Sequence, residues 1–242
     1  MDKIAVLVPA FNEAASIERV VKKIQETNPH ADVVVINDGS SDETESLAQR
    51  AGATVLSLVV NLGYGAALQT GYKYALRNNY DYTVQIDGDG QHDPGFVENL
   101  IAKLKNGSDV AIGSRFLGNL NDYKNPTIRE LGMMFFRTLI YLFIHRRITD
   151  PTSGFQAMNR KVFEFFAESN QYPSDFPDAD IIILLHYAGF EVSEVPVVMY
   201  NSETGKSMHS GFKPLYYIIK MLLSIYAVLL GNDKILKVGN AS

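Results

Sequence analysis

Two carboxylates separated by one glycine, Asp87 and Asp89, are the residues of this sequence best suited to metal chemistry. They follow an apolar run, so acceptor-only oxygens gather at the tip of an expected strand, which is unfavourable unless a cation neutralises them. Mg²⁺ or Mn²⁺ fits, because these ions take hard oxygen ligands and complete their shell with substrate phosphates. Gln91 and His92 follow closely, and we expect them to add a ligand or a hydrogen bond. An isolated Asp-x-Asp is more often a solvated acidic turn, but the polar clusters elsewhere in the chain favour the metal site.

Further polar clusters follow the other apolar runs of the first half of the chain. Asp38 either forms an Asx-turn before a helix or, beside the cluster after the first run, holds a nucleoside. Gly63 and Gly65 precede a helix and resemble a phosphate cradle, although a tight turn with close packing explains two glycines equally well. The clusters expected at strand ends are Asn12-Glu13, Asn37-Asp38, Asp87/Asp89 and Ser114-Arg115.

An alternation of short apolar strands with amphipathic helices must position these clusters. The pattern predicts strands over 4–8, 33–36, 54–58, 82–86 and 109–112. It predicts helices over 16–26, from a Ser40/Glu43 capping box to about Gly52, over 65–76, and from Pro94 onward. This rhythm indicates an α/β fold with a mostly parallel sheet and helices on both faces. Such sheets bind ligands at the carboxyl ends of their strands, where the clusters lie.

The second half of the chain breaks this alternation and contains two very apolar helices. We expect loops over 118–125 and 150–155, a strand over 191–199, and helices over 128–144, 161–168, 178–188 and 214–230. The helices over 128–144 and 214–230 are core, an oligomer interface or membrane-surface elements. Arg137 interrupts the first, Lys220 interrupts the second, and basic residues there would suit anionic lipid headgroups.

Composition excludes several classes of protein. The net charge of -5 over 242 residues argues against a nucleic-acid partner, because a phosphate-binding surface normally needs a basic excess. With no cysteine, disulfides and thiolate metal sites are ruled out. The N-terminus does not have the layout of a signal peptide, so a cytoplasmic location is expected. No uninterrupted apolar run reaches the roughly 18 residues of a membrane span.

Five motifs in this order and spacing resemble the family 2 inverting glycosyltransferases, which have the GT-A fold. They are Pro9-Ala10-Phe11-Asn12-Glu13, Asn37-Asp38-Gly39-Ser40, Asn61-x-Gly63-x-Gly65, Asp87-Gly88-Asp89-Gly90-Gln91-His92 and Gly113-Ser114-Arg115. The sequence looks most like the dolichol-phosphate mannosyltransferase branch and its bacterial polyprenyl-phosphate relatives. The resemblance implies a catalytic domain over 1–210, containing the apolar helix at 128–145, and a C-terminal apolar or juxtamembrane helix and tail over 211–242.

The resemblance also implies roles for individual positions. Asp38, Pro9 and Glu13 would line the nucleoside pocket, and residues 150–155 would form the loop beneath the donor sugar. The catalytic set is Asp89, Arg115 and Arg129, with both arginines gripping the acceptor phosphate, and the metal set is Asp87, Asp89 and Gln91. The substrate-binding set is Pro9, Ala10, Asn12, Glu13, Asp38, Gly63, Gly65, Asp87, Gly88, Ser153, Gly154, Lys206 and Ser207. In one departure from the family pattern, Ser202 stands where relatives often carry an arginine, so Lys206 or His209 would supply that charge.

The expected reaction moves a sugar from a nucleotide-sugar, with UDP favoured over GDP, to polyprenyl phosphate with inversion. A lipid monophosphate is already anionic, so positioning by arginines can replace a catalytic base. Two alternatives stay open. One is a transferase that extends a surface polysaccharide, for which Asp178 or Asp180 would be the base, although both also suit helix capping. The other is a non-catalytic nucleotide-sugar-binding protein. The expected location is the inner face of the plasma membrane, with a membrane-protein partner or a homo-oligomer as further options.

Overall fold

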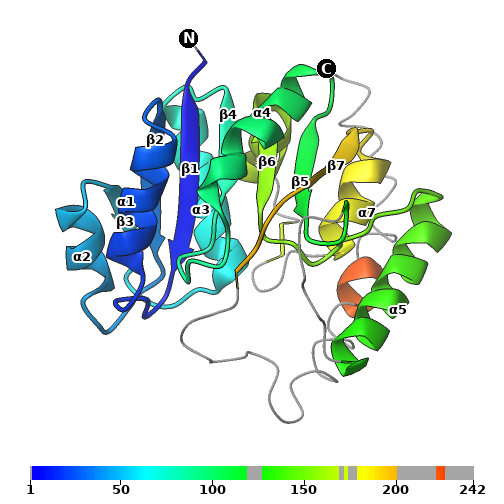
Figure 1. Cartoon of the computed structure of the whole chain (residues 1–242), viewed down its shortest axis with the longest axis horizontal. Helices are drawn as coiled ribbons and strands as arrows, with labels where there is room; N and C mark the ends of the chain where they lie inside the picture. The colour runs from blue at the N-terminus through cyan, green and yellow to red at the C-terminus, as the bar shows by residue number, and fades with distance from the viewer. Residues whose placement is uncertain (1, 119–126, 169–171, 174–178, 201–221, 227–242) are drawn as a thin grey trace.

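The computed structural model describes residues 2–118, 127–168, 172–173, 179–200 and 222–226, with residues 127–132 described by their backbone alone. In this part of the chain, seven strands form one sheet in the order β3-β2-β1-β4-β6-β5-β7 (Figure 1). Strand β6 runs antiparallel to both neighbours, and all other neighbouring strands are parallel. The mostly parallel sheet is therefore confirmed. The strands are β1 Ile4–Ala10, β2 Ala31–Asn37, β3 Thr54–Ser57, β4 Tyr82–Gln85, β5 Val110–Ser114, β6 Gln156–Asn159 and β7 Val192–Pro196.

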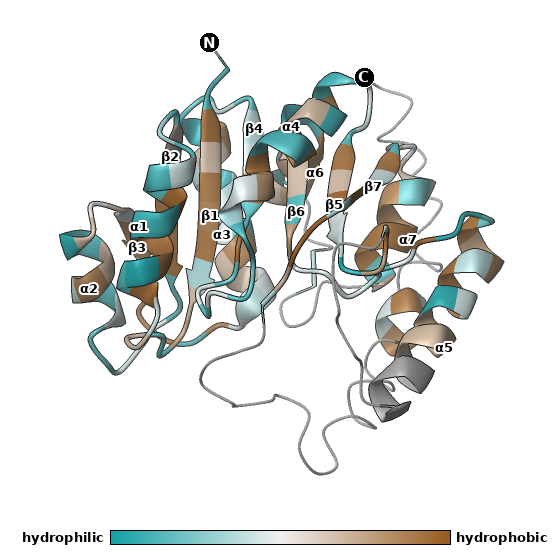
Figure 2. Cartoon of the chain, viewed as in Figure 1, coloured by the Kyte–Doolittle hydropathy of each residue, from teal (hydrophilic) through white to brown (hydrophobic). Residues whose placement is uncertain are grey.

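Helices cover both faces of the sheet, as the sequence predicts. One face carries α1 Ile17–Thr27, α2 Thr44–Arg50 and α4 Val97–Lys105, which follows a 3-10 turn at Pro94–Phe96. The other carries α3 Tyr64–Arg77, α5 Thr127–Ile144, α6 Arg160–Glu168 and α7 Ala179–Tyr187. Neighbouring residues of a strand point to opposite faces, so Leu7 packs into one core and Val6 and Val8 into the other. Figure 2 shows the resulting apolar strands between helices that are polar on their outer sides.

Central strand β1 is apolar throughout because both of its faces are covered. All seven of its residues are buried, which explains a continuous apolar run in place of an alternating one. Helix α3 approaches this strand closely at Gly71, where an added Cβ would lie 3.0 Å from Leu7 Cδ1 and 3.1 Å from Ile36 Cδ1. A larger residue at position 71 would require the Leu7 and Ile36 side chains to shift by a few tenths of an ångström.

Strand β6 was not predicted from the sequence. Its residues, Gln156 to Asn159, contain no β-branched or aromatic side chain and follow a loop motif, so the strand signal is weak. The strand forms because it fills the gap between β4 and β5 and pairs with both. Its last residue also starts α6, since Asn159 Oδ1 accepts a hydrogen bond from the Val162 N–H at 3.2 Å.

The predicted capping box at Ser40 and Glu43 is wrong. Helix α2 begins only at Thr44, and the side chain of Glu43, the residue before it, forms no capping bond. The Ser40 hydroxyl accepts a hydrogen bond from the Asn12 N–H at 3.0 Å, while Asp42 Oδ1 accepts one from the Thr44 N–H at 3.0 Å. The bond from Asn12 joins the loop after β1 to the loop after β2 and occupies the hydroxyl that the capping box would need.

Helix α5 confirms the apolar helix expected over 128–144 and exposes part of its apolar surface. Met134, Phe135, Tyr141 and Leu142 are all exposed. Of the predicted C-terminal helix over 214–230, residues 222–226 are described and are helical; the remainder, and the boundary predicted at residue 210, lie outside the described residues. Among the helices that are described, none combines the length and the apolar character required to cross a bilayer.

Replacing Asn159 with alanine tests the stabilising role of β6. Asn159 Nδ2 also donates to Asp109 Oδ1 at 2.7 Å, so the substitution removes a bond to the residue before β5 as well as the bond to α6. We expect Asn159→Ala to lower the free energy of unfolding by about 1–2 kcal/mol in urea denaturation. Asn106→Ala is the matched control, because the exposed Asn106 side chain bonds to none of the described residues. Equal stability of both variants would contradict the role given to Asn159.

Candidate functional site

The ends of β1, β2 and β4 bring the predicted clusters together. Ala10 lies opposite Asn37, and Leu7 lies opposite Gln85, so the loops after these strands leave the same edge of the sheet. Gly88 packs against the end of β1: an added Cβ would lie 3.3 Å from the Pro9 carbonyl oxygen and 3.5 Å from both Ala10 Cβ and Glu13 Cγ. The structure thus joins Pro9, Ala10, Glu13 and the Asp87–Asp89 turn in one place, as the strand-end argument predicts.

Carboxylates are concentrated at this edge. Burial is the main reason that the pKa of Glu13 is raised, and the charges of Asp89, Asp87 and Asp42 act in the same direction. Burial likewise raises the pKa of Asp87, with a further contribution from Asp89. His92, a hydrogen bond from Tyr64 and the charge of Arg115 oppose that rise. Two neighbouring carboxyl groups with raised pKa values mark a site that a cation would stabilise.

Asp87 is held in one orientation by residues from three elements. The Tyr64 hydroxyl, at the start of α3, donates to Asp87 Oδ1 at 2.6 Å and accepts from Gln85 Nε2 at 2.6 Å. The backbone of the 150–155 loop lies against the same pair, because a Cβ on Gly154 would lie 3.0 Å from Asp87 Oδ2 and 3.1 Å from the Tyr64 oxygen. Glycine at 154 therefore permits the loop to approach the carboxylate.

His92 closes the turn that contains both aspartates. It is buried, its Nδ1 accepts a hydrogen bond from the Asp87 N–H at 3.1 Å, and its Nε2 lies 3.6 Å from Asp87 Oδ2. Its ring stacks on Phe155 with centroids 5.2 Å apart and planes 14° apart. The imidazole thus fixes the turn from within and links it to the 150–155 loop.

Asp87, Asp89 and Gln91 fit a divalent cation of the magnesium type. Asp89 accepts hydrogen bonds from the Gln91 N–H at 2.9 Å and from the Gln91 side-chain amide. Within the described residues, no group of three or more His, Asp or Glu side chains forms a complete metal cage. Two carboxylates suffice for Mg²⁺ or Mn²⁺ when phosphates and water supply the other ligands. The donor set therefore matches a metal shared with a phosphate-bearing substrate.

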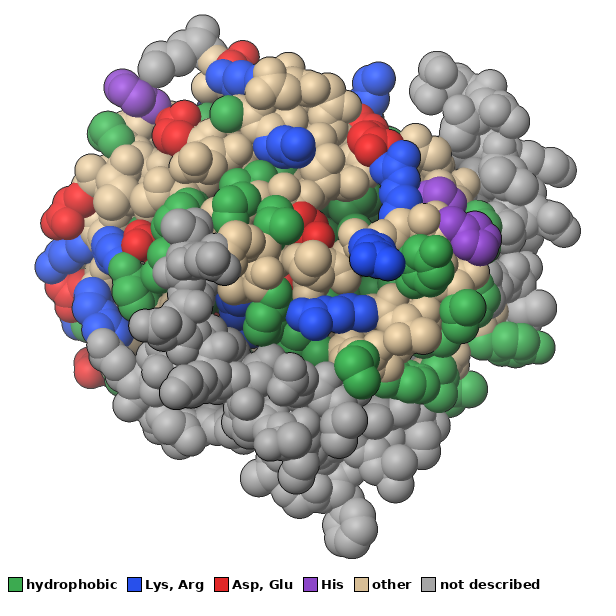
Figure 3. Space-filling view, turned by 45° about the vertical axis from the view of Figure 1, so that its right-hand side comes forward, with side chains coloured by type: hydrophobic (Ala, Val, Ile, Leu, Met, Phe, Trp, Pro, Cys, Tyr) green, Lys and Arg blue, Asp and Glu red, His purple; other side chains and the backbone are tan. Residues whose placement is uncertain are grey.

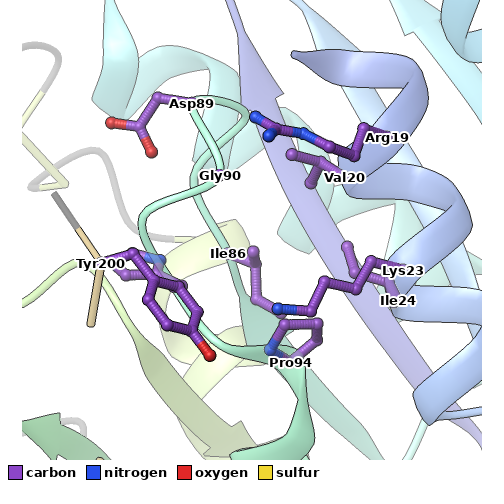
Figure 4. A pocket seen from close by; sticks show the side chains of 10 residues that line it. Arg19, Val20, Lys23, Ile24, Ile86, Asp89, Gly90, Pro94 and Tyr200 are labelled. Atoms are coloured by element: carbon purple, nitrogen blue, oxygen red, sulfur yellow. The ribbon is translucent and has the colours of Figure 1, made fainter. Parts of the chain in front are cut away.

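A cavity of about 250 Å³ borders Asp89 on the side of α1 (Figure 4). Arg19 extends from α1 toward the turn at Asp89 and Gly90, and Tyr200 forms the opposite wall. Tyr200 is held there by a hydrogen bond from its hydroxyl to Asp93 Oδ2 at 2.7 Å and by Lys23, whose Nζ lies 4.8 Å from the ring centroid. The cavity is lined by Arg19, Val20, Lys23, Ile24, Ile86, Asp89, Gly90, His92, Pro94 and Tyr200.

The residues predicted to bind the nucleotide have structural partners of their own. Asp38 is buried, and its two oxygens accept the backbone N–H groups of Leu62 at 2.8 Å and Gly63 at 3.0 Å. Asn12 Oδ1 accepts from the Ser41 N–H at 2.9 Å. Gly63, with a φ of 97°, leads directly into α3, so Gly63 and Gly65 do flank a helix N-terminus. Contact of these residues with a nucleotide remains a prediction.

Arg115 forms the principal ion pair at this edge. Its Nε and one terminal nitrogen donate to Asp150 Oδ2 and Oδ1, both at 2.7 Å, and its backbone N–H donates to Oδ2 at 3.0 Å. A further bond reaches the Thr152 hydroxyl at 3.1 Å. Asp150 is fully buried, and the backbone before it is held by Glu194 of β7. Arg115 thus anchors the loop that carries Gly154.

Ser153 also serves this loop, because its hydroxyl donates to the Gly113 carbonyl oxygen at 2.6 Å. Asp180 lies in the first turn of α7 and is fully buried, and its carboxylate accepts bonds from the Ile181 N–H and from the Ser224 hydroxyl. Five predicted positions lie outside the described residues, namely Asp178, Ser202, Lys206, Ser207 and His209, and for Arg129 only the backbone in α5 is described.

The sequence argument assigned no role in the site to Tyr64 or Gln85. Tyr64 lies between the two predicted glycines, but nothing in the sequence indicates that its hydroxyl reaches Asp87. Gln85 could have been found, because it is a polar residue within an apolar strand. A buried polar side chain requires a hydrogen-bond partner, which indicates a polar site nearby.

Removing one or both charges of the Arg115–Asp150 pair tests whether the pair anchors the loop. Arg115→Gln leaves a buried carboxylate without its cation, so we expect the free energy of unfolding to fall by about 3–5 kcal/mol. Arg115→Gln combined with Asp150→Asn removes both charges and should recover most of that loss in urea denaturation. A single variant as stable as the wild type, or a double variant no better than the single one, would contradict this role.

Several known proteins resemble this chain over most of its length. An uncharacterized protein of Methanocaldococcus jannaschii is 33% identical over 224 residues, covering 90% of this chain and 91% of that protein. The polyprenol monophosphomannose synthase of Mycolicibacterium smegmatis is 29% identical over 220 residues, covering 85% of this chain and 80% of that protein. Glucosyl-3-phosphoglycerate synthase of Mycobacterium tuberculosis, solved with Mn²⁺, UDP and glucosyl-3-phosphoglycerate, aligns with a TM-score of 0.69 at 22% identity, covering 96% and 80%. This likeness confirms the expected GT-A fold.

A sequence model described as "Glycosyl transferase family 2" matches residues 5–166, a range that includes the predicted site residues from Pro9 to Gly154. The sheet, the strand-end clusters and this match have one explanation: the chain belongs to glycosyl transferase family 2 and is a glycosyltransferase.

Proposed function

We propose that this protein transfers a sugar from a nucleotide-sugar to the phosphate of a polyprenyl phosphate at a membrane surface, with inversion at the anomeric carbon. The observation that carries the proposal is the joining of Asp87 and Asp89 with Glu13 at the carboxyl ends of β4 and β1. A carboxylate pair in this position is suited to a cation that is shared with a diphosphate.

The donor is proposed to be a nucleotide-sugar bound with Mg²⁺ or Mn²⁺, and UDP is favoured over GDP. Asp87 and Asp89 would hold the metal, with Gln91 as a further ligand. When bound, the metal neutralises charge on the leaving diphosphate as a Lewis acid. The Mn²⁺ and UDP in the solved relative of the same fold support this choice.

The acceptor is proposed to be a lipid phosphate met at the membrane surface. The name of the relative from Mycolicibacterium smegmatis supports a polyprenol acceptor. Helix α5 supports contact with a bilayer, because exposed apolar side chains lie along it and basic residues follow it at Arg146 and Arg147. Figure 3 shows hydrophobic and basic side chains intermixed on the face turned forward. The cytoplasmic, inner face of the plasma membrane is the expected location.

The residues of the chain would position the reactants for one displacement. A phosphate oxygen of the acceptor attacks the anomeric carbon while the bond from that carbon to the diphosphate breaks, so one inversion occurs and the nucleoside diphosphate leaves. Tyr64 and Gln85 hold Asp87 in place, and Gly154 lets the sugar-side loop approach it. Oriented reactants contribute much of the rate in such reactions.

The choice of catalytic base also favours a phosphate acceptor over a sugar hydroxyl. A sugar hydroxyl would need a carboxylate to remove its proton. Asp180, the described candidate, is fully buried and hydrogen-bonded, which does not favour that task. A phosphate acceptor is already ionised and needs no proton removed.

Thermal unfolding with Mn²⁺ and nucleotides tests the donor site. Binding at about 100 times the dissociation constant adds about 2.7 kcal/mol, so Mn²⁺ with the correct nucleoside diphosphate should raise the melting temperature by roughly 5–10 °C. Asp89→Asn should abolish this rise. Asp2→Asn, an exposed aspartate paired with Lys105 at the N-terminus, is the control and should keep it. A full rise in Asp89→Asn would contradict the metal assignment.

Product analysis tests the acceptor. With polyprenyl phosphate and a panel of UDP- and GDP-sugars, we expect metal-dependent release of the nucleoside diphosphate and an acid-labile glycosyl phospholipid detected by mass. An acid-stable glycoside would instead indicate polysaccharide extension. Nucleotide binding without any turnover would indicate a nucleotide-sugar-binding protein.

A further inference from the structure

Two arginines, Arg115 and Arg137, lie close to the aromatic ring of Phe116, next to the 150–155 loop. The guanidinium carbon of Arg115 is 5.4 Å from the ring centroid of Phe116, and that of Arg137, from α5, is 4.8 Å from the same centroid. Phe116 follows β5 directly, and its N–H donates to the Ser114 hydroxyl at 3.2 Å. The edge of the sheet that carries Gly154 therefore also carries two cations.

The two arginines differ in how their charge is neutralised. Arg115 is paired with the buried carboxylate of Asp150 through two bonds of 2.7 Å. Arg137 forms no ion pair with any acidic side chain in the described part of the chain, although Arg146, at the end of the same helix, pairs with Glu191. Of these two arginines, Arg137 is therefore the one whose charge no acidic side chain of the described residues neutralises directly.

Arg137 is held in place by a hydrogen bond from its Nε, and not through its two terminal nitrogens. Its Nε donates to the Thr149 carbonyl oxygen at 2.7 Å, and the side chain is half-buried. Thr149 is itself fixed, since its N–H donates to Glu194 and its hydroxyl is 2.6 Å from that of Ser114. Neither terminal nitrogen of Arg137 donates to another described residue. A guanidinium anchored at Nε with free terminal nitrogens is prepared to bind a phosphate through two parallel bonds.

The surroundings of Arg137 on α5 match an amphiphilic ligand. Met134 and Tyr141 lie three residues before and four residues after it, so they flank it on one side of the helix. Met134 is 58% exposed and Tyr141 is 46% exposed, so apolar surface is open on both sides of the charge. A phosphate at Arg137 would thus have apolar surface beside it for the chain that the phosphate carries.

We propose that Arg137 is a binding residue for the phosphate of the acceptor, and that Arg115 positions the 150–155 loop and orients Phe116 beneath Arg137. This assignment rests on the proposed function, because it names the residue that recognises its acceptor. It differs from the expectation drawn from the family resemblance, in which Arg115 and Arg129 grip the acceptor phosphate.

Steady-state kinetics with a water-soluble, short-chain prenyl phosphate tests the assignment without a bilayer. Arg137→Gln removes a charged donor worth about 1.5–3 kcal/mol, so we expect the KM for the prenyl phosphate to rise about 10-fold to 100-fold. The KM for the nucleotide-sugar and the thermal shift with Mn²⁺ and nucleotide should stay as in the wild type. Arg137→Lys keeps the charge but not the paired donors. Its KM for the prenyl phosphate should lie between those of the wild type and Arg137→Gln.

Arg147→Gln is the matched control, because Arg147 is an exposed arginine shortly after α5 that forms no ion pair with a described residue. The contact proposed for Arg147 is with a bilayer, and this assay contains none. Its acceptor KM should equal that of the wild type. Binding of the prenyl phosphate and of the corresponding prenyl alcohol, measured by calorimetry, adds a second readout. The wild type should prefer the phosphate, and Arg137→Gln should lose that preference while still binding the alcohol.

The outcomes separate this inference from the proposed function. An unchanged acceptor KM and an unchanged phosphate preference in Arg137→Gln, with an active wild type, would overturn the inference and leave the proposed function standing. An equal loss in Arg147→Gln would also overturn it, since general surface charge would then explain the effect. A wild type that neither binds nor glycosylates the prenyl phosphate would overturn both.

Discussion

The ion pair between Arg115 and the fully buried Asp150 joins the two halves of this protein at the edge where the site lies. Arg115 ends the strand-and-helix portion of the chain, and Asp150 begins the loop that leads into β6. Breaking such a pair leaves an uncompensated buried charge, which is far more costly than never having formed it. The loop therefore has one stable position, and through Gly154 and Phe155 it lies against Asp87 and His92.

A second constraint is the crowding of like charges at the carboxyl ends of β1 and β4. Glu13 and Asp87 both have raised pKa values, with burial as the main cause and neighbouring acids as an added one. The protein limits this cost with hydrogen bonds from Tyr64 and Ser16. The remaining excess of negative charge favours a bound cation, which links the electrostatics of this edge to the chemistry proposed for it.

Much of the fold could be predicted because its signals are local and periodic. The parallel strands, their helices and α5 all follow from apolar runs of the correct length and period. Strand β6 could not be predicted, because Gln156 to Asn159 have little preference for a strand until β4 and β5 lie on either side. The Ser40 capping box failed for a related reason: the hydroxyl bonds to Asn12, a residue from another loop that local pattern cannot bring near.

For the site, the sequence by itself determined which acids, glycines and arginines gather at one edge of the sheet, since parallel strands place their carboxyl ends together. It also determined family membership through the order of those motifs. Only the tertiary structure decided which partner each polar group takes. It placed the Tyr64 hydroxyl on Asp87, paired Arg115 with Asp150, and left Arg137 without an acidic partner among the described residues. Hydrogen bonds and ion pairs depend on distances of about 3 Å between residues far apart in the chain, and local sequence pattern carries no information at that scale.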